Sequence, residues 1–216
     1  MRVLILANGE PPSPELARQM AAEHTLLLAT DGAAHAAAAL GLTPDVICGD
    51  FDSIDLSAAE AAFPGSTFVP TPDQHQADLE KAIDLACAQG ATEITVLGAT
   101  GGRIDHLLAN YALLARAPAN GWLCFRDDRG SVRAISGTDA TPGTLSLRAT
   151  PGDTISLIAY EPTVRATIEG VRWPLDRAPL LPGTRGVSNI ALQQEVRIEA
   201  RGGVLLVCHL YRLTTG

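Results

Sequence analysis

The segment Gly49–Asp55, GDFDSID, places three aspartates, Asp50, Asp52 and Asp55, directly after the apolar run DVICG. Carboxylates this close repel one another, by about 4 kcal/mol for a pair 4 Å apart under a protein-like dielectric, unless a cation or protons lie between them. Asp50 and Asp52 are two positions apart on extended chain, so their side chains point the same way with Cα atoms roughly 6.5 Å apart. Two such carboxylates can share one hard cation, and Mg²⁺ fits best.

Two more acids are expected at the same edge of a predicted sheet. Asp31 follows the run LLLAT, and Asp78 opens a predicted helix after VPTPDQHQA. In an open parallel sheet, ligands bind beyond the carboxyl ends of the strands. Taken alone, Asp78 would more often be a helix cap with Lys81 as a solvated partner, and we interpret Asp55 as the cap of the helix from Leu56. The grouping of four acids at strand ends favours a metal site instead.

A second signal is GATGGRIDHLLAN, residues 98–110, which again reads as a strand end, a glycine turn and a helix start. Gly101 and Gly102 let the backbone approach a ligand closely, and a helix N-terminus offers N–H groups to phosphate. Arg103 adds a forked positive charge. Asp105 is expected to face a cation or a hydroxyl group, because a carboxylate that faced the phosphates would be repelled by them. The segment matches neither the P-loop nor G-x-G-x-x-G, so it is weak evidence by itself.

These residues must be positioned by the elements around them, and residues 1–126 alternate short apolar runs with helical patterns. That alternation is typical of an α/β domain with a mostly parallel sheet flanked by helices. Strands are expected at residues 2–8, 25–30, 45–49, 66–70, 93–99 and 121–127. Helices are expected at Pro14–Glu23, Gly32–Leu40, Leu56–Phe63, Asp78–Gln89 and Ile104–Arg116.

The pattern changes after RDDRG, at residues 126–130, where no helical period survives. Short strands, for example at residues 144–147, 153–160, 164–171 and 203–211, are separated by glycine and proline. Such a pattern predicts an all-β sandwich or barrel. We therefore expect an α/β domain over residues 1–126 and a second domain over residues 131–216.

Composition narrows the class of protein. The 216 residues are 46% hydrophobic, enough for a sizeable core, and the net charge of −8 with no basic run argues against a nucleic-acid surface. No apolar run is long enough to cross a membrane, so we expect a cytoplasmic protein without membrane partners. The four cysteines lie far apart in apolar segments and are expected to be reduced core residues.

Taken together, the segments DGAA, PDVICGDFDSI, PDQ…ADLEKAI, GATGGRIDHLLAN and GVSN resemble the thiamine pyrophosphokinases in order and spacing, from about residue 8 to residue 189. The resemblance implies transfer of a pyrophosphoryl group from ATP to the hydroxyethyl arm of thiamine, which leaves AMP. It also implies an α/β domain followed by a β-sandwich. The expected assembly is a homodimer whose sites lie between domains of different subunits.

The resemblance assigns roles in the first domain. Asp50, Asp52 and Asp78 become the Mg²⁺ ligands, directly or through water, and Asp31 supports them. Gln74 and Arg103, with the turn glycines, are expected near the nucleotide or its phosphates.

Further roles concern thiamine. Asp105 matches the acid beside thiamine, where it would accept or orient the hydroxyl proton. Ser188 and Asn189 match the motif that brings the sandwich domain to the site. Trp173 stands where bacterial members often have tyrosine and is expected either to stack on thiamine or to belong to the core.

Some positions depart from the family pattern. His75 and Ala77 stand where the family usually has an acid and a threonine, which affects the details of the metal shell. His106 follows Asp105 in the predicted helix and would point roughly 100° away from it, so we interpret His106 as structural.

Two other functions fit parts of the sequence. A metal-dependent phosphohydrolase could use GDFD, although the five histidines form no typical two-metal set. A non-catalytic nucleotide sensor could use the sandwich as a partner-binding module. Phosphate release without thiamine would favour the phosphohydrolase. AMP formation would argue against the sensor, which would bind ATP and make none.

Overall fold

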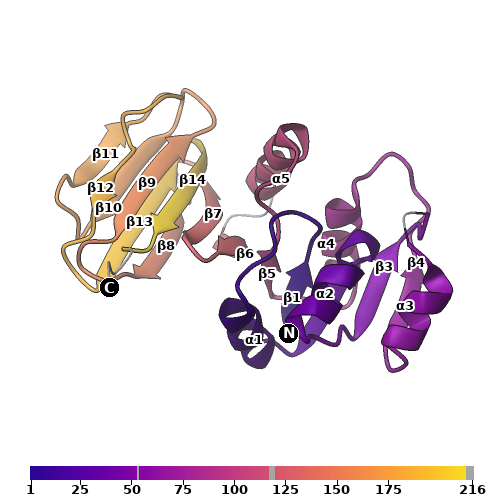
Figure 1. Cartoon of the computed structure of the whole chain (residues 1–216). Coiled ribbons are helices and arrows are strands. Elements are labelled where there is room, and N and C mark those ends of the chain that lie inside the picture. Colours follow the sequence, from indigo (N-terminus) through magenta and orange to yellow (C-terminus); the bar gives the residue numbers. More distant parts are fainter. Residues whose placement is uncertain (53, 117–119, 213–216) are drawn as a thin grey trace. The chain divides into compact units, whose positions relative to one another are not determined.

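Apolar runs bounded by glycine, proline and aspartate form the strands of this chain. The structure is a computed structural model, and it describes residues 1–52, 54–116 and 120–212. The chain divides into two units, Met1–Tyr111 with Phe125–Asp128, and Ala112–Cys124 with Arg129–Gly216. Figure 1 follows both units along the sequence from indigo to yellow.

The first unit is an α/β structure, as the alternating pattern predicts. Its strands are β1 (Arg2–Leu6), β2 (Leu26–Thr30), β3 (Val46–Gly49), β4 (Thr67–Pro70) and β5 (Glu93–Leu97), and β6 (Asn120–Asp127) contributes its last residues. Its helices are α1 (Pro14–Glu23), a 3₁₀ turn η1 (Asp31–Ala33), α2 (Ala34–Leu40), α3 (Leu56–Ala62), α4 (Asp78–Ala88) and α5 (Ile104–Arg116). The expected helices and strands of this region are therefore confirmed to within a few residues.

The sheet of this unit has the order β5-β1-β2-β3-β4, and all of these neighbours pair in parallel. Side chains alternate across the sheet, so Leu4 and Leu6 join a core with α1 and α2, while Val3 and Ile5 point to the opposite face. Helix α4 packs against β1, β2 and β3. Burial on both faces explains why these strands read as continuous apolar runs.

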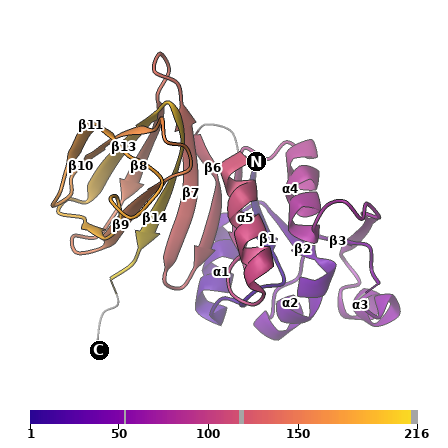
Figure 2. The same cartoon turned by 90° about the horizontal axis from the view of Figure 1, so that it is seen from above.

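The second unit is an antiparallel sandwich, as the pattern after residue 130 predicts. Its strands are β7 (Gly130–Gly137), β8 (Gly143–Arg148), β9 (Thr154–Ala159), β10 (Arg165–Glu169), β11 (Leu175–Pro179), β12 (Asn189–Ile190), β13 (Glu195–Arg201) and β14 (Gly203–Leu210). They form the sheets β12-β9-β14-β7 and β11-β10-β13-β8, which face each other in Figure 2. Residues from both sheets, such as Leu157 and Ile198, share one core.

One expectation about the cysteines is wrong. None of the four forms a disulfide bond; Cys48 and Cys124 are buried, but Cys87 is exposed on α4. Cys87 lies one residue after the buried Ala86, at the edge of the buried stripe of the helix. Within the described ranges, no helix is both long enough and apolar enough to span a bilayer.

Candidate active site

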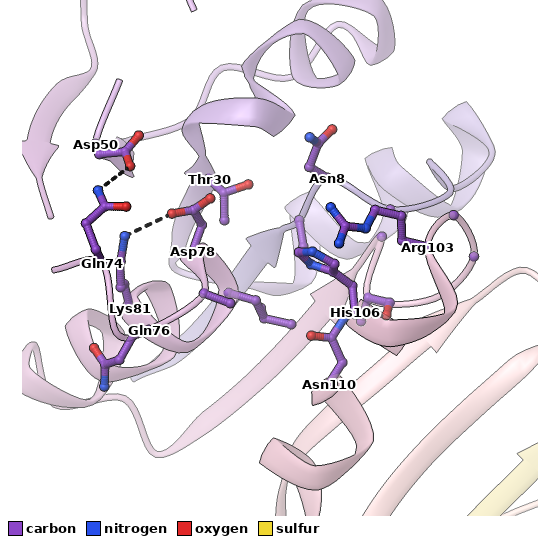
Figure 3. A pocket seen from close by; sticks show the side chains of 18 residues that line it. Asn8, Thr30, Asp50, Gln74, Gln76, Asp78, Lys81, Arg103, His106 and Asn110 are labelled. Atoms are coloured by element: carbon purple, nitrogen blue, oxygen red, sulfur yellow. Dashed lines mark hydrogen bonds and ion pairs between the residues drawn. The ribbon is translucent and has the colours of Figure 1, made fainter. Parts of the chain in front are cut away.

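A pocket of about 420 Å³ lies in the first unit, where β1, β2, β3 and β5 end and α4 and α5 begin (Figure 3). We call it the polar pocket. Six residues assigned from the sequence line it: Asp50, Gln74, Asp78, Gly101, Gly102 and Arg103. Its wall also contains side chains that were not assigned to a site: Asn8, Thr30, Gln76, Lys81, His106 and Asn110. Three other assigned residues of this unit, Asp31, Asp52 and Asp105, are not among its lining residues.

Glycines bring the ends of β1 and β5 together at this pocket. The Gly9 N–H donates to the Gly98 carbonyl oxygen at 2.8 Å, and a Cβ atom on Gly9 would lie only 2.3 Å from that oxygen. Gly98 itself has φ +71°, which favours glycine. The chain turns from β1 to β2 on one side and returns to β5 on the other, so the pocket lies at the point where strand order reverses, a usual ligand position in open α/β sheets.

Asp31 supports the acidic loop from behind and does not line the pocket. Its carboxylate is buried and accepts hydrogen bonds from the Gly32 N–H at 2.7 Å and the Phe51 N–H at 2.9 Å. Gly49 leaves room for it, because a Cβ atom there would lie 2.1 Å from the Asp31 Cγ. Phe51 has φ 59°, a strained value for a bulky residue, and the hydrogen bond from Phe51 to Asp31 holds that turn.

Asp50 and Asp52 form a close, unequal pair. The Gln74 amide donates to Asp50 at 3.0 Å, and the Asp52 N–H donates to Asp50 at 3.2 Å. These hydrogen bonds, that from Gln74 first, lower the pKa of the Asp50 carboxyl. The pKa of Asp52 is raised, because it hydrogen-bonds to Asp50 in its protonated form and its negative charge is repelled by Asp50. Two carboxyl groups that repel each other in this way provide a site that a cation can stabilise.

Asp78 pairs with a buried lysine. The Lys81 Nζ lies 3.2 Å from the Asp78 carboxylate, and the Lys81 side chain is only 5% exposed. The alternative interpretation of the sequence, a helix-capping Asp78 with a solvated Lys81, is contradicted by this burial. Asp78 is not the N-cap of α4 either. The N-cap is Ala77, whose methyl group cannot accept a hydrogen bond.

The residues present fit a magnesium ion of the usual protein type. In the part of the chain that the structure describes, no three histidine, cysteine or acidic groups are gathered closely enough to hold a metal alone. Mg²⁺ usually keeps several waters and is bound by one or two carboxylates together with substrate phosphates. Asp50 and Asp78 on the pocket wall, with Asp52 next to Asp50, meet that requirement.

The start of α5 differs from its expected arrangement. Arg103 lines the pocket and forms a two-pronged ion pair with Asp105, at 2.5 Å and 3.1 Å. Hydrogen bonding from Arg103 lowers the pKa of the Asp105 carboxyl to about 2, which leaves it a weak base. His106, interpreted from the sequence as structural, lies on the pocket wall (Figure 3). Asp105 is not among the lining residues.

A second pocket, of about 360 Å³, lies in the second unit and brings Trp173, Ser188 and Asn189 together. We call it the Trp173 pocket. Trp173 is 56% exposed, so it is not a core residue, and the Arg172 guanidinium lies 5.5 Å from its ring centre. The Asn189 side chain accepts from the Trp173 N–H at 3.1 Å and donates to the Trp173 carbonyl at 2.6 Å. Asn189 therefore positions the segment that carries the tryptophan.

Two family models match this chain. Residues 17–123 match "Thiamin pyrophosphokinase, catalytic domain", and residues 144–205 match "Thiamin pyrophosphokinase, vitamin B1 binding domain". Together the two matches cover most of the chain. The polar pocket draws its acidic and basic side chains from the first matched region, and the Trp173 pocket lies within the second.

Individual relatives agree with these models. The chain is 27% identical to the thiamine pyrophosphokinase of Bacillus subtilis over 86% of this chain and 87% of that protein. It is 33% identical to thiamine pyrophosphokinase 1 of Oryza sativa over 72% of this chain and 62% of that protein.

Solved structures agree in fold. The thiamine pyrophosphokinase of Bacillus subtilis superposes with a TM-score of 0.83 at 24% identity, covering 99% of this chain and 100% of that one. The enzyme of Geobacillus thermodenitrificans superposes with a TM-score of 0.80 at 25% identity, covering 99% of each chain. The resemblance found from the sequence motifs is confirmed, and the chain belongs to the thiamine pyrophosphokinase family.

Proposed function

We propose that this enzyme transfers the pyrophosphoryl group of ATP to the hydroxyl group of thiamine, giving thiamine diphosphate and AMP. One observation carries the proposal: each unit has its own pocket, and the two pockets offer different chemistry. The polar pocket provides carboxylates and cationic side chains at the carboxyl ends of parallel strands, as a polyphosphate with a metal requires. The Trp173 pocket provides an exposed aromatic ring beside a hydrogen-bonded asparagine, as a flat heterocycle requires.

Mg²⁺ is the proposed metal, held by Asp50 and Asp78 with help from Asp52. The raised pKa of Asp52, which is caused by its hydrogen bond to Asp50 and their mutual repulsion, supports a cation beside this pair. When bound, Mg²⁺ would neutralise charge on the phosphate oxygens.

The side chains of this chain position the reactants. Arg103 can offer its fork to a phosphate once it turns from Asp105, since both side chains are largely exposed. The thiamine hydroxyl oxygen attacks the β-phosphorus in line, the bond from that phosphorus to the α–β bridging oxygen breaks, and AMP leaves. Asp105 orients the hydroxyl proton, because a carboxyl with a pKa of about 2 removes it poorly. Phosphoryl transfer depends mainly on positioning and electrostatics, so no strong base is required.

Thiamine is proposed to bind at the Trp173 pocket, with Trp173 stacking on a ring and Ser188 near the ligand. Asn189 is a positioning residue in this arrangement, because its amide is already bonded to the Trp173 backbone. We further propose a homodimer in which the polar pocket of one subunit works with the Trp173 pocket of the other. Multi-angle light scattering at assay concentration tests the dimer, and a monomer that is fully active would contradict it.

The decisive assay mixes the purified protein with ATP, Mg²⁺ and thiamine and follows both products. AMP and thiamine diphosphate should appear in equal amounts. Phosphate release without thiamine would indicate a phosphohydrolase instead. ATP binding without AMP formation would indicate a nucleotide sensor.

A further inference from the structure

The Thr30 hydroxyl group is buried without a hydrogen-bond partner in the described parts of the chain. Thr30 is the last residue of β2 and is only 2% exposed, yet its Oγ1 atom has no hydrogen-bond partner among the described residues. A buried hydroxyl without a partner destabilises a protein, because it has lost its hydrogen bonds to water without a replacement. Such a group is expected to have a ligand or a water as its partner, and Thr30 lines the polar pocket.

The position of Thr30 in the sheet brings it to the same side as α4. In β2, Leu27 and Ala29 join the core with α1 and α2, so alternation turns Leu28 and Thr30 to the opposite face. Helix α4 packs on β2 and β3. Thr30 is also the register partner of Cys48, two residues before Asp50.

Lys81 and the start of α4 supply positive charge to the same pocket. Lys81 is buried, lines the pocket and is paired with Asp78. Helix α4 is 11 residues long and begins at Asp78. Its N-cap, Ala77, makes no side-chain capping hydrogen bond, so the helix start has no acceptor from a capping side chain. Residues 76–79 of this helix start also line the pocket.

We infer that the Thr30 hydroxyl, the Lys81 ammonium group and the first-turn N–H groups of α4 form a subsite for one phosphate group of a polyphosphate. All three contribute hydrogen-bond donors, and the helix dipole favours an anion at that end. Asp78 does not oppose this, because Lys81 already offsets its charge in the absence of ligand. The inference rests on the proposed function for the identity of the natural ligand, a nucleoside triphosphate.

Thr30→Val tests the subsite, because valine keeps the shape and removes only the hydroxyl. Calorimetric titration with inorganic tripolyphosphate, in EDTA so that no cation takes part, should show a loss of affinity of roughly tenfold or more. Thr30→Ser restores a hydroxyl and should bind within about threefold of the wild type. The melting temperature of Thr30→Val should equal or exceed that of the wild type, since the unpartnered hydroxyl is gone.

Thr71→Val is the matched control. The Thr71 hydroxyl also has no partner among the described residues, but Thr71 does not line the polar pocket. Its removal should leave tripolyphosphate affinity unchanged. An equal loss in both variants would overturn the subsite, because it would reflect a general change in the fold.

Three further results would overturn it: no tripolyphosphate binding by the wild type, unchanged affinity in Thr30→Val, or an effect seen only with Mg²⁺ present. The last would make Thr30 a metal ligand. A wild type that binds tripolyphosphate through Thr30 but forms no thiamine diphosphate would uphold the subsite and contradict the proposed function instead.

Discussion

The polar pocket and the Trp173 pocket hold their polar groups in opposite ways. In the polar pocket, charged side chains face one another, as Lys81 does with Asp78 and Arg103 does with Asp105. In the Trp173 pocket, the side-chain amide of Asn189 is already hydrogen-bonded to the backbone of Trp173 and Ile190. The first pocket keeps groups that a ligand can take over, and the second keeps a rigid frame around one exposed ring.

This difference predicts how each pocket fails. Substitutions of Arg103, or of Asp52 beside the polar pocket, should remove an interaction with the ligand and leave the fold intact, because Arg103 is exposed and Asp52 is repelled by Asp50. Substitutions in the frame of the Trp173 pocket affect the fold and the ligand together, because the same hydrogen bonds serve both. The experiments below compare these two kinds of failure.

Asp52→Asn should have the largest effect. It keeps the size of the side chain and removes one charge, so activity should fall by orders of magnitude if the pair with Asp50 holds Mg²⁺. The thermal midpoint should hold or rise, since the repulsion that raises the pKa of Asp52 is relieved. Turnover at limiting Mg²⁺ and a melting curve measure both.

Asp55→Asn is the control for charge loss in the same segment. Asp55 accepts the Ala58 N–H at 3.1 Å as the N-cap of α3, confirming the sequence interpretation, and asparagine caps equally well. Its activity and stability should stay near those of the wild type. More than half of normal turnover in Asp52→Asn would remove Asp52 from the site.

Arg103→Lys should have the next largest effect. Lysine keeps the charge but loses the fork, so ATP affinity should fall by about tenfold or more, from about 1.5–3 kcal/mol for a lost charged hydrogen bond. Stability should change little, because the pair with Asp105 is exposed. Arg197→Lys is matched to it, since Arg197 forms a similar exposed fork with Glu195. Unchanged ATP kinetics in Arg103→Lys would place Arg103 outside the site.

Asn189→Ala should reduce both the stability of the fold and the binding of thiamine. It leaves the Trp173 carbonyl and two N–H groups without their partner, so the free energy of unfolding should fall by about 1–3 kcal/mol. The KM for thiamine should rise while that for ATP stays. Ser188→Ala is the control for stability alone, because the hydrogen bond of Ser188 to Ser156 is made by its backbone N–H and not by its side chain. A stable Asn189→Ala variant with a normal KM for thiamine would contradict the role of Asn189 in positioning the segment that carries Trp173.

The local structure could be predicted because it depends on local pattern. The ranges expected for α1 and α5, Pro14–Glu23 and Ile104–Arg116, are those observed, since apolar spacing and Gly or Pro boundaries are present in the sequence itself. The rule that ligands bind at the carboxyl ends of parallel strands then brought Asp50, Asp78 and Arg103 to one pocket.

The errors concern directions that only tertiary contacts decide. Lys81 reads as a surface residue. It lies two residues from both Leu79 and Ile83, which on a helix is about 200° away from each, so the apolar spacing of α4 does not predict its burial. Asp105 was expected to face the ligand and His106 to point away from it. In the structure Asp105 is paired with Arg103 and His106 lines the polar pocket, and no helical period predicts that pairing.

Asp153→Asn should have the smallest effect and sharpens the comparison between the acids of the two units. Asp153 is 4% exposed and accepts hydrogen bonds from His209, Thr150 and Arg212 at 2.7–2.9 Å, unlike the exposed Asp52. Burial raises its pKa, but these hydrogen bonds outweigh burial, so the net pKa lies below its usual value.

A depressed folded-state pKa means that the stabilisation is complete above the unfolded pKa, near 4, and is lost as the pH falls through the folded value. The difference in free energy of unfolding between wild type and Asp153→Asn, measured in urea, should therefore be about 1–2 kcal/mol at pH 7 and shrink below about pH 4. Glu195→Gln is the control. The pKa of Glu195 is also lowered, by Arg197, but the pair is exposed to solvent, so this substitution should leave the free energy of unfolding nearly unchanged. A difference for Asp153→Asn that grows toward low pH would reverse the sign and contradict the assignment of Asp153 as a charged, hydrogen-bonded anchor.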